Sequence, residues 1–377
     1  MTALTRRLGV GWSWRRHPLP VALAAIAAAA LVGLVLCLIA GAGPGQTISA
    51  LVEGTVGTPF AIGTSLNAAS VLILIAGGFT IAFRAGLVNV GGEGQLAAGG
   101  VAAAAVGTTL GAGTPAVIAL PAVLAAGAAG GALWAAIAAY LRVRRDASEI
   151  ITTLLLNFVG LALITLMVNE PSLLRQPQTS SETLPQSSPL IDSAHIPLLG
   201  LDSSPTTVAL LLALAVVLAL GIVLRQTATG LRLRTVGLSP SAASRLGMPV
   251  ARHLFVSLTT AGALAGLAGG VLIATSPFVL VEGFTSGYGF TGLVVGLLAR
   301  GSMLAVIAVS LLLAFLTSGG INLQLVAGVP SSTVTIVAAL ITIFIAGAAA
   351  QGAMTNFSRR PTPAPTPGPA ASAPTGA

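Results

Sequence analysis

The stretch Thr64-Ser-Leu-Asn-Ala-Ala-Ser-Val-Leu-Ile-Leu-Ile-Ala-Gly-Gly-Phe-Thr-Ile-Ala-Phe83, followed directly by Arg84, decides the fold of this chain. It carries no charge, and about twenty apolar residues are enough for an α-helix to cross a bilayer. The whole chain shares this character, because 55% of its 377 residues are hydrophobic and only 7% are charged. A soluble domain has about 25% charged residues. We therefore predict an all-α integral membrane protein.

Working outward from this stretch, hydropathy predicts about ten spans within a transmembrane domain at residues 19–356. The expected spans are Leu19–Ala42, Thr64–Phe83, Leu96–Gly111, Pro115–Tyr140, Glu149–Val168, Thr207–Leu224, Leu254–Thr275, Phe284–Ala299, Met303–Thr317 and Ser332–Ala350. The Phe284–Ala299 segment would cover only about 24 Å at 1.5 Å per residue, which is short of a core of about 30 Å. We expect it to be a broken or re-entrant helix.

Charge predicts the orientation. When these spans are threaded in order, all seventeen arginines except Arg175 fall on one side, and cytoplasmic loops are the arginine-rich ones. Both termini are therefore expected in the cytoplasm, with residues 1–18 as an N-terminal segment and 357–377 as a disordered Pro-rich tail. Residues 169–206 become an external loop and residues 225–253 a cytoplasmic loop.

Several classes of function are disfavoured by composition. The chain has no lysine, which excludes a P-loop of the common type and Schiff-base chemistry. Cys37 is the single cysteine, and the three histidines lack ligand spacing, so we expect no metal site. No nucleophile–base pair and no basic-aromatic surface for nucleic acid is evident. The chain is expected to be a non-catalytic membrane protein, and any ATP would be hydrolysed by another chain.

A glycine-rich segment, Gly91–Gln95, opens the third span, and we expect its first turns not to be regular helix. Transporters place substrate at such interruptions. Glu93 is the acid expected within the membrane; it either pairs with Arg84 or a neighbouring chain near the inner interface, or acts in the pathway or its gating. Asn157 either bonds between helices or contacts substrate.

Two further glycine patterns are present. Gly287-Tyr-Gly-Phe-Thr-Gly292 has the spacing of a dinucleotide fingerprint but lies in no βαβ unit, so it predicts a second broken helix opposite the first. Gly262, Gly266 and Gly270 lie four residues apart and predict a face for close helix packing.

The loop at 225–253 is basic and carries no acid. Pro240 suits the first position of a short helix, with Ser239 as its cap and an end near Gly247. The loop either lies on lipid or presents a docking helix to a soluble ATPase.

At this loop the chain resembles a known family. Thr229-Gly-Leu-Arg-Leu-Arg-Thr-Val-Gly-Leu-Ser-Pro240, continuing to Met248, resembles the coupling loop of bacterial ABC importer permeases of the ribose/branched-chain amino acid type. Phe83–Gln95, Glu149–Asn157 and Gly289–Ala299 resemble the nucleoside-type branch, and the long external loop suits the larger of its two paired permeases. The family often has an acid or amide where this chain has Ser239 and Ser241.

The resemblance implies a multi-pass permease subunit in a bacterial plasma membrane. It would pair with a second permease, bind two ATP-binding subunits that hold ATP–Mg, and receive nucleosides from an extracellular binding protein; the chain itself would bind no cofactor. The expected coupling residues are Ser239, Pro240, Ala242, Ala243, Arg245, Leu246 and Gly247. The pathway candidates are Asn89, Glu93, Gln95, Asn157 and Phe290.

Alternatives stay open at this point. The same machine could carry ribose-like sugars or branched-chain amino acids. An ion-coupled secondary transporter would favour several buried carboxylates, and Glu93 is the main candidate for one. A non-transporting scaffold would explain the apolar spans but not the broken ones.

Overall fold

The structure is a computed structural model that describes residues 31–35, 37–39, 41–177, 184–329, 336 and 339. The N-terminal segment at 1–18 and the tail lie outside the described residues, as do most of the first and most of the last expected span. Within the described part the chain is helical, and its extended segments form isolated bridges rather than strands.

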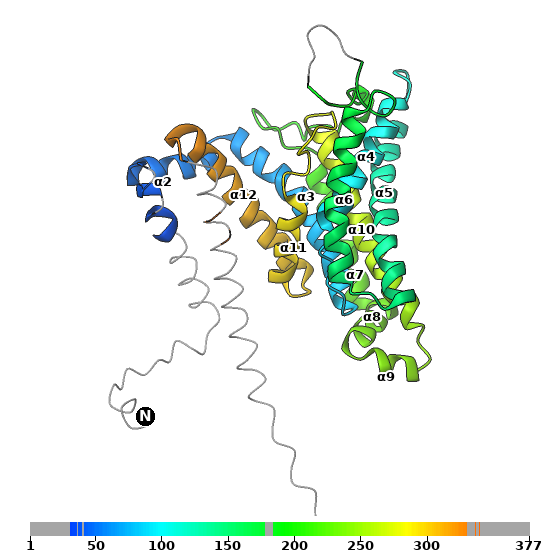
Figure 1. Cartoon of the computed structure of the whole chain (residues 1–377). Helices are drawn as coiled ribbons and strands as arrows, with labels where there is room; N and C mark the ends of the chain where they lie inside the picture. The colour runs from blue at the N-terminus through cyan, green and yellow to red at the C-terminus, as the bar shows by residue number, and fades with distance from the viewer. Residues whose placement is uncertain are drawn as a thin grey trace, which may run out of the picture.

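The helices follow the order of the expected spans (Figure 1). They are α2 Pro44–Val52, α3 Pro59–Arg84, α4 Gly92–Thr109, α5 Ala116–Arg145, α6 Glu149–Asn169, α7 Ala209–Gln226, α8 Ala228–Leu238, α9 Pro240–Arg245, α10 Val250–Thr275, α11 Tyr288–Ala299 and α12 Met303–Ala327. Six of them are long and apolar enough to cross a membrane, namely α3, α5, α6, α7, α10 and α12. These six confirm six of the expected spans.

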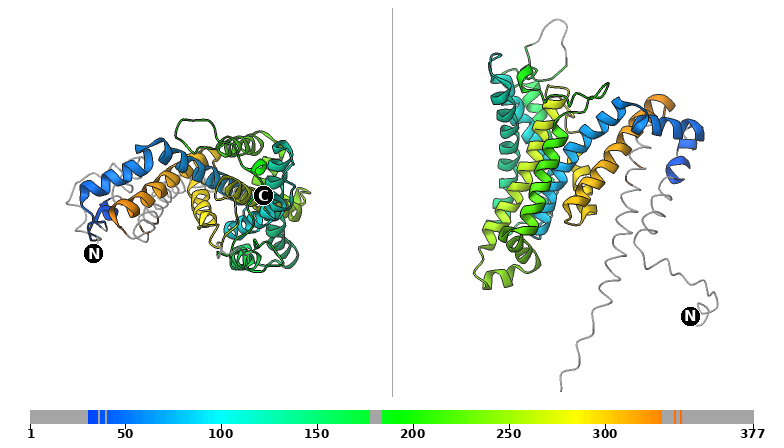
Figure 2. Two further views of the ribbon diagram at one scale, coloured as in Figure 1. Left: turned by 90° about the horizontal axis from the view of Figure 1, so that it is seen from above. Right: turned by 180° about the vertical axis from the view of Figure 1, so that it is seen from behind.

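Helices α4, α5, α6 and α10 stand together as a bundle, and α3 packs between α10 and α7. Helix α2 and the far part of α12 lie together at the side of the bundle (Figures 1 and 2). Helix α4 packs against α5, α6 and α10. It covers most of the third expected span and is buried along most of its length, but it is not among the six helices that are long and apolar enough to cross a membrane.

The interior of the bundle is built on glycine. A Cβ atom placed on Gly266 of α10 would overlap the carbonyl oxygen of Gly127 and lie 2.7 Å from the Cα of Gly131, both on α5. Gly99 of α4 meets Gly266 in the same way. The three helices therefore approach backbone to backbone, which confirms the predicted packing face. Gly270 is looser, with its nearest neighbours at 3.5 Å.

Helix α11 confirms the expected short element. Its twelve residues cover about 18 Å at 1.5 Å per residue, roughly half of a bilayer core. It begins after an irregular segment in which Gly283 and Gly287 have positive φ. A side chain would be strained at these two turns, and glycine avoids that strain.

The loop between α6 and α7, which we expect to be external and call the external loop, is tied to the bundle at several points. Ile196 donates its backbone N–H to the carbonyl of Ala274 at 2.8 Å, and Leu190 donates to Phe278 at 2.8 Å. Asn67 of α3 donates its Nδ2 to the carbonyl of Pro205 at 2.7 Å. These hydrogen bonds hold residues 190–205 of the loop against α3, α10 and the segment after α10.

Candidate functional site

The first turns of α4 correct one prediction. Gly92 to Gln95 are regular α-helix with Gly91 as the N-cap, so the expectation of irregular backbone there was wrong. The glycines serve close approach instead: a Cβ atom on Gly94 would lie 3.0 Å from the Cα of Asn157. The non-helical backbone lies just before α4, from Leu87 to Val90.

Two pathway candidates form a reciprocal amide pair at this point. Asn89 donates its Nδ2 to Oε1 of Gln95 at 2.9 Å, and Gln95 donates its Nε2 to Oδ1 of Asn89 at 2.9 Å. Asn89 Oδ1 also accepts the backbone N–H of Gly91 at 3.0 Å. Both side chains are buried, and their hydrogen bonds fix the chain's entry into α4.

Asn157 of α6 holds the same segment from the other side. Its Nδ2 donates to the carbonyl of Val90 at 2.9 Å, and its Oδ1 accepts the N–H of Gly94 at 2.9 Å. Thr153, one turn earlier on α6, accepts the N–H of Val90 at 3.2 Å. The interhelical hydrogen bonding predicted for Asn157 is confirmed.

Glu93 is buried, with 2% of its surface exposed, and it contacts the start of α11. Its Oε1 accepts the N–H of Gly287 at 3.1 Å and its Oε2 accepts the N–H of Gly289 at 2.7 Å. The carboxylate therefore satisfies the unpaired amides of a helix N-terminus and interacts favourably with its dipole.

The predicted partnership of Glu93 with Arg84 was wrong. Arg84 ends α3 and donates its Nη2 to the carbonyl of Gly301 at 2.7 Å and its Nη1 to the carbonyl of Leu224 at 3.1 Å. It therefore joins the ends of α3 and α7 to the turn after α11. Hydropathy placed both residues near one interface, but it could not show which helix ends each would meet.

The two glycine segments meet, as their pattern predicted. A Cβ atom on Gly289 would overlap the backbone of Glu93, and one on Gly92 would lie 3.0 Å from the carbonyl oxygen of Gly289. The structure thus brings together four of the five pathway candidates. The fifth, Phe290, is on the first turn of α11, and its side chain is 40% exposed.

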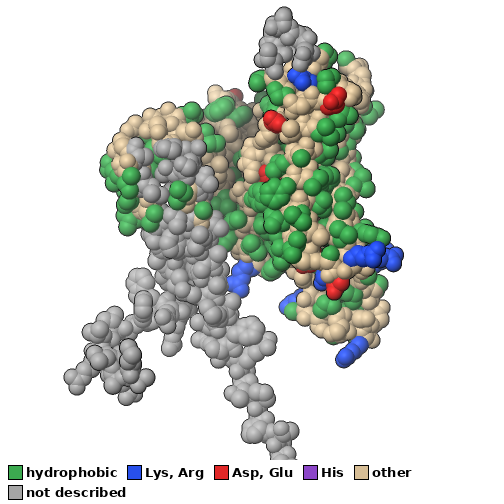
Figure 3. Space-filling view, viewed as in Figure 1, with side chains coloured by type: hydrophobic (Ala, Val, Ile, Leu, Met, Phe, Trp, Pro, Cys, Tyr) green, Lys and Arg blue, Asp and Glu red, His purple; other side chains and the backbone are tan. Residues whose placement is uncertain are grey.

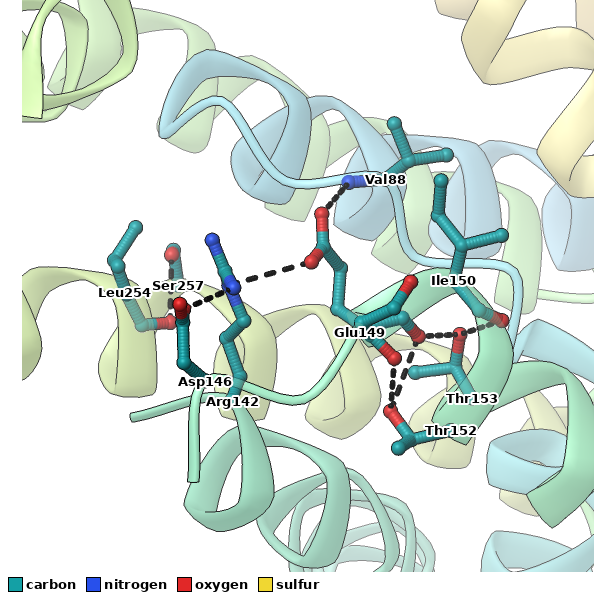
Figure 4. Close-up of polar contacts among 10 residues, drawn as sticks. Val88, Arg142, Asp146, Glu149, Ile150, Thr152, Thr153, Leu254 and Ser257 are labelled. Atoms are coloured by element: carbon teal, nitrogen blue, oxygen red, sulfur yellow. Dashed lines mark hydrogen bonds and ion pairs between the residues drawn. The ribbon is translucent and has the colours of Figure 1, made fainter. Parts of the chain in front are cut away.

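An ionic cluster that the sequence analysis missed lies beside this site (Figure 4). Glu149, the first residue of α6, has its Oε2 3.3 Å from Nε of Arg142, and Arg142 Nη1 contacts Asp146 at 2.6 Å. The other Glu149 oxygen accepts the N–H of Val88 at 3.5 Å. The sequence did offer a signal for this cluster, because Arg142, Asp146 and Glu149 lie within and beside a short turn between two apolar spans.

The short helix predicted after Ser239 is present as α9, and α8 precedes it unexpectedly. Ser239 Oγ accepts the N–H of Ala242 at 3.3 Å, Pro240 is the first residue, and Gly247 follows the end with a φ of 75°. Ala243 is fully buried, whereas Leu246 is 70% exposed. One side of this short helix therefore packs on the rest of the chain, and the other side is exposed.

Most of the described arginines gather at the end of the bundle that carries α8 and α9 (Figure 3). No group of three or more His, Cys, Asp or Glu side chains suited to a metal ion occurs among the described residues. The features of the site are thus a buried, hydrogen-bonded cluster between α4, α6 and α11, and an exposed short helix. Together with the multiple spans they define a membrane transport subunit.

The chain belongs to the family described as branched-chain amino acid transport system / permease component, whose model matches residues 61–346. Three relatives are similar over most of its length. The guanosine ABC transporter permease NupP of Bacillus subtilis is 32% identical, over 88% of this chain and 94% of its own. The glucose ABC transporter permease TsgB13 of Haloferax volcanii is 34% identical, over 88% of both chains.

The third relative is the nucleoside ABC transporter permease NupB of Lactococcus lactis, which is 30% identical, over 86% of this chain and 90% of its own. No solved structure matches the chain. The membership confirms the predicted resemblance to ABC importer permeases.

Proposed function

We propose that this permease carries nucleosides into the cell, within an ABC importer whose ATP is hydrolysed on a partner subunit. The printed names of NupP and NupB, guanosine and nucleoside permeases, support the nucleoside. A neutral solute is favoured mainly by one observation, the contact of the Glu93 carboxylate on α4 with the start of α11.

A half-length helix with a free N-terminus near mid-membrane attracts the carboxylate or phosphate of a solute. Here the backbone amides of Gly287 and Gly289 are bonded to Glu93. A second carboxylate at that end would meet a buried like charge in surroundings of low dielectric constant. This arrangement disfavours amino acids and nucleotides and favours uncharged nucleosides, whose bases could stack on the half-exposed ring of Phe290.

A neutral sugar is the second candidate, because TsgB13 is named a glucose permease and is as similar as the nucleoside relatives. Uptake separates the two. Cells that express the complete importer would be given labelled guanosine together with an excess of unlabelled adenosine, glucose or leucine. Inhibition by adenosine and not by glucose is the expected result. Inhibition by glucose would transfer the assignment to the sugar, and inhibition by leucine would contradict the argument from Glu93.

The partners follow from the family. They would be a second related permease, two ATP-binding subunits that carry ATP–Mg, and an extracellular substrate-binding protein, with the complex in a bacterial plasma membrane. Ala242 and Arg245 of α9, and Leu246 directly after it, would contact an ATP-binding subunit. This chain would hold no cofactor and catalyse no reaction.

The contacts around α8 explain how such docking would act on the spans. A Cβ atom on Gly86, just after α3, would lie 3.1 Å from the Cα of Gly237 on α8. Arg84 joins the end of α3 to Leu224 at the end of α7. A displacement of α8 and α9 would therefore be passed directly to the ends of two spans.

Purification from native membranes in mild detergent tests the assembly. Recovery of an ATP-binding subunit and a second permease with this chain is expected. Uptake that stops with a protonophore at constant ATP would instead indicate the ion-coupled alternative.

A further inference from the structure

A groove of about 680 Å³ lies where α7, α8, α10 and the turn after α9 meet. One part of its wall is apolar and belongs to two membrane-spanning helices, with Leu220 and Val223 on α7 and Val256 on α10. Leu246, from the turn after α9, also lines it. The exposed fractions of Val223, Val256 and Leu246 are 39%, 50% and 70%, so the groove leaves apolar surface uncovered.

The other part of the wall is basic. Arg232 of α8 and Arg252 of α10 line the groove, and both are exposed. Neither guanidinium makes a hydrogen bond or an ion pair to any described residue. His253, which also lines the groove, is bonded through Nδ1 to the carbonyl of Pro249 at 2.9 Å.

Among the residues that the structure describes, no carboxylate is paired with these arginines. Residues 203–281 contain neither Asp nor Glu. The acids of the neighbouring turn between α5 and α6, Asp146 and Glu149, are already paired with Arg142. The positive charge at the groove is therefore available to an anion from outside the chain.

We propose that the groove binds one anionic phospholipid, with its phosphate between Arg232 and Arg252 and an acyl chain along α7 and α10. Both requirements, an anion and an apolar chain in one molecule, are met by such a lipid, and basic pockets at the ends of membrane helices suit anionic headgroups. The wall continues onto helices that lie in the bilayer, so the lipid can enter from the side.

The bound lipid would hold the turn from Leu246 to Pro249 against α7 and α10. Since this turn follows α9, the lipid would fix the position of the predicted docking helix. Binding itself does not rest on the proposed function and can be measured on the full chain alone.

The test is native mass spectrometry of the purified full chain after equilibration with phosphatidylglycerol or with phosphatidylcholine of the same acyl chains. One retained phosphatidylglycerol per chain is expected, favoured over phosphatidylcholine by about tenfold or more. The double variant Arg232→Gln/Arg252→Gln should lose that preference. The control Arg225→Gln/Arg234→Gln removes the same charge outside the groove and should keep it.

A second variant tests the acyl chain without changing charge. Val256→Trp fills the groove and should reduce lipid retention, while its thermal unfolding temperature and elution volume stay close to those of the unmodified chain. Hydrogen exchange at residues 246–253 should slow in phosphatidylglycerol, and Arg232→Gln/Arg252→Gln should abolish this slowing.

Three results would overturn the proposal. Equal retention by both double variants would show that the arginines of the groove do not select the lipid. Displacement of the bound lipid by free glycerol phosphate would indicate a site for a soluble anion. Displacement by an added ATP-binding subunit would show that the groove belongs to a protein partner.

Discussion

Two polar regions of this molecule satisfy their charges in opposite ways. At the start of α4 the carboxylate of Glu93 and the amides of Asn89, Gln95 and Asn157 are buried, and each is hydrogen-bonded within the chain. Beside the end of α7 and the start of α10, Arg232 and Arg252 are exposed and make no such bond to the described residues.

The difference distinguishes polar groups that stabilise the fold from polar groups that are available to bind a partner. A buried polar group without a hydrogen bond costs about 1–3 kcal/mol, so an interior tolerates it only when it is paired. An exposed arginine has no such requirement and is available to lipid or protein. Variants in the buried region should therefore change the stability of the chain, and variants in the exposed region should change what binds to it.

The largest effect is expected in the glycine packing that supports the buried region. Gly266→Ala places a methyl group against the backbone of Gly127 and Gly131. Overpacking typically costs about 1–3 kcal/mol and occasionally more, and we expect a value above this range because backbone must move. Gly270→Ala, one turn later, meets neighbours only at 3.5 Å and should be tolerated. Thermal unfolding of the purified chains measures both, and equal stability would contradict the close approach.

The next effect is expected at Asn157. Asn157→Leu removes the partners of Val90 O and Gly94 N together, which should cost about 2–4 kcal/mol in total. The control Asn169→Leu lies at the exposed end of the same helix and should cost less than about 0.5 kcal/mol. A similar loss in both variants would show that the buried hydrogen bonds are not the cause.

A smaller loss is expected for Glu93→Gln, since the amide oxygen still accepts one N–H but the negative charge at the start of α11 is gone. We expect about 1–2 kcal/mol of lost stability, reduced uptake, and an importer that still assembles. Glu170→Gln, on the external loop, should leave all three unchanged. Uptake at the original level with normal expression would remove Glu93 from the pathway.

The smallest effect on stability belongs to the exposed region. Arg245→Asp/Leu246→Asp should leave the unfolding temperature nearly unchanged, because surface substitutions stay within about 0.5 kcal/mol. The same variant should lose the ATP-binding subunit during co-purification. Arg175→Asp, on the external loop, serves as the control. An ATP-binding subunit that still co-purifies would count against α9 as the docking helix.

Periodic and compositional features were readable from the sequence. The length of the apolar segments predicted α3, α5, α6, α7, α10 and α12. The spacing of Gly262 and Gly266 predicted the face of α10 on which another helix packs closely. Ser239 and Pro240 defined the start of α9, because capping depends on neighbours in the chain. The juxtaposition of the two glycine segments was also predicted, since broken helices of separate halves tend to meet.

Contacts between distant residues were less accessible. Glu93 and Gly289 are separated by 196 positions, and nothing local shows that a carboxylate in one glycine segment caps the helix that begins in the other. The same applies to Arg84 and Gly301. Helix α8 was missed because its arginines and threonines resemble a loop by hydropathy, and its helical form depends on the buried contacts of Leu233 and Val236.

Helix α3 is a single continuous helix that is hydrogen-bonded to other parts of the chain near both of its ends. Near its start, Asn67 is bonded to Pro205 and Thr207 of the external loop, and at its last residue Arg84 is bonded to Leu224 and Gly301. Its 26 residues span about 39 Å. A displacement of one end of this helix is therefore passed on to the other end. A protein that tilts the external loop and a protein that moves α8 would therefore both displace α3, one from each end.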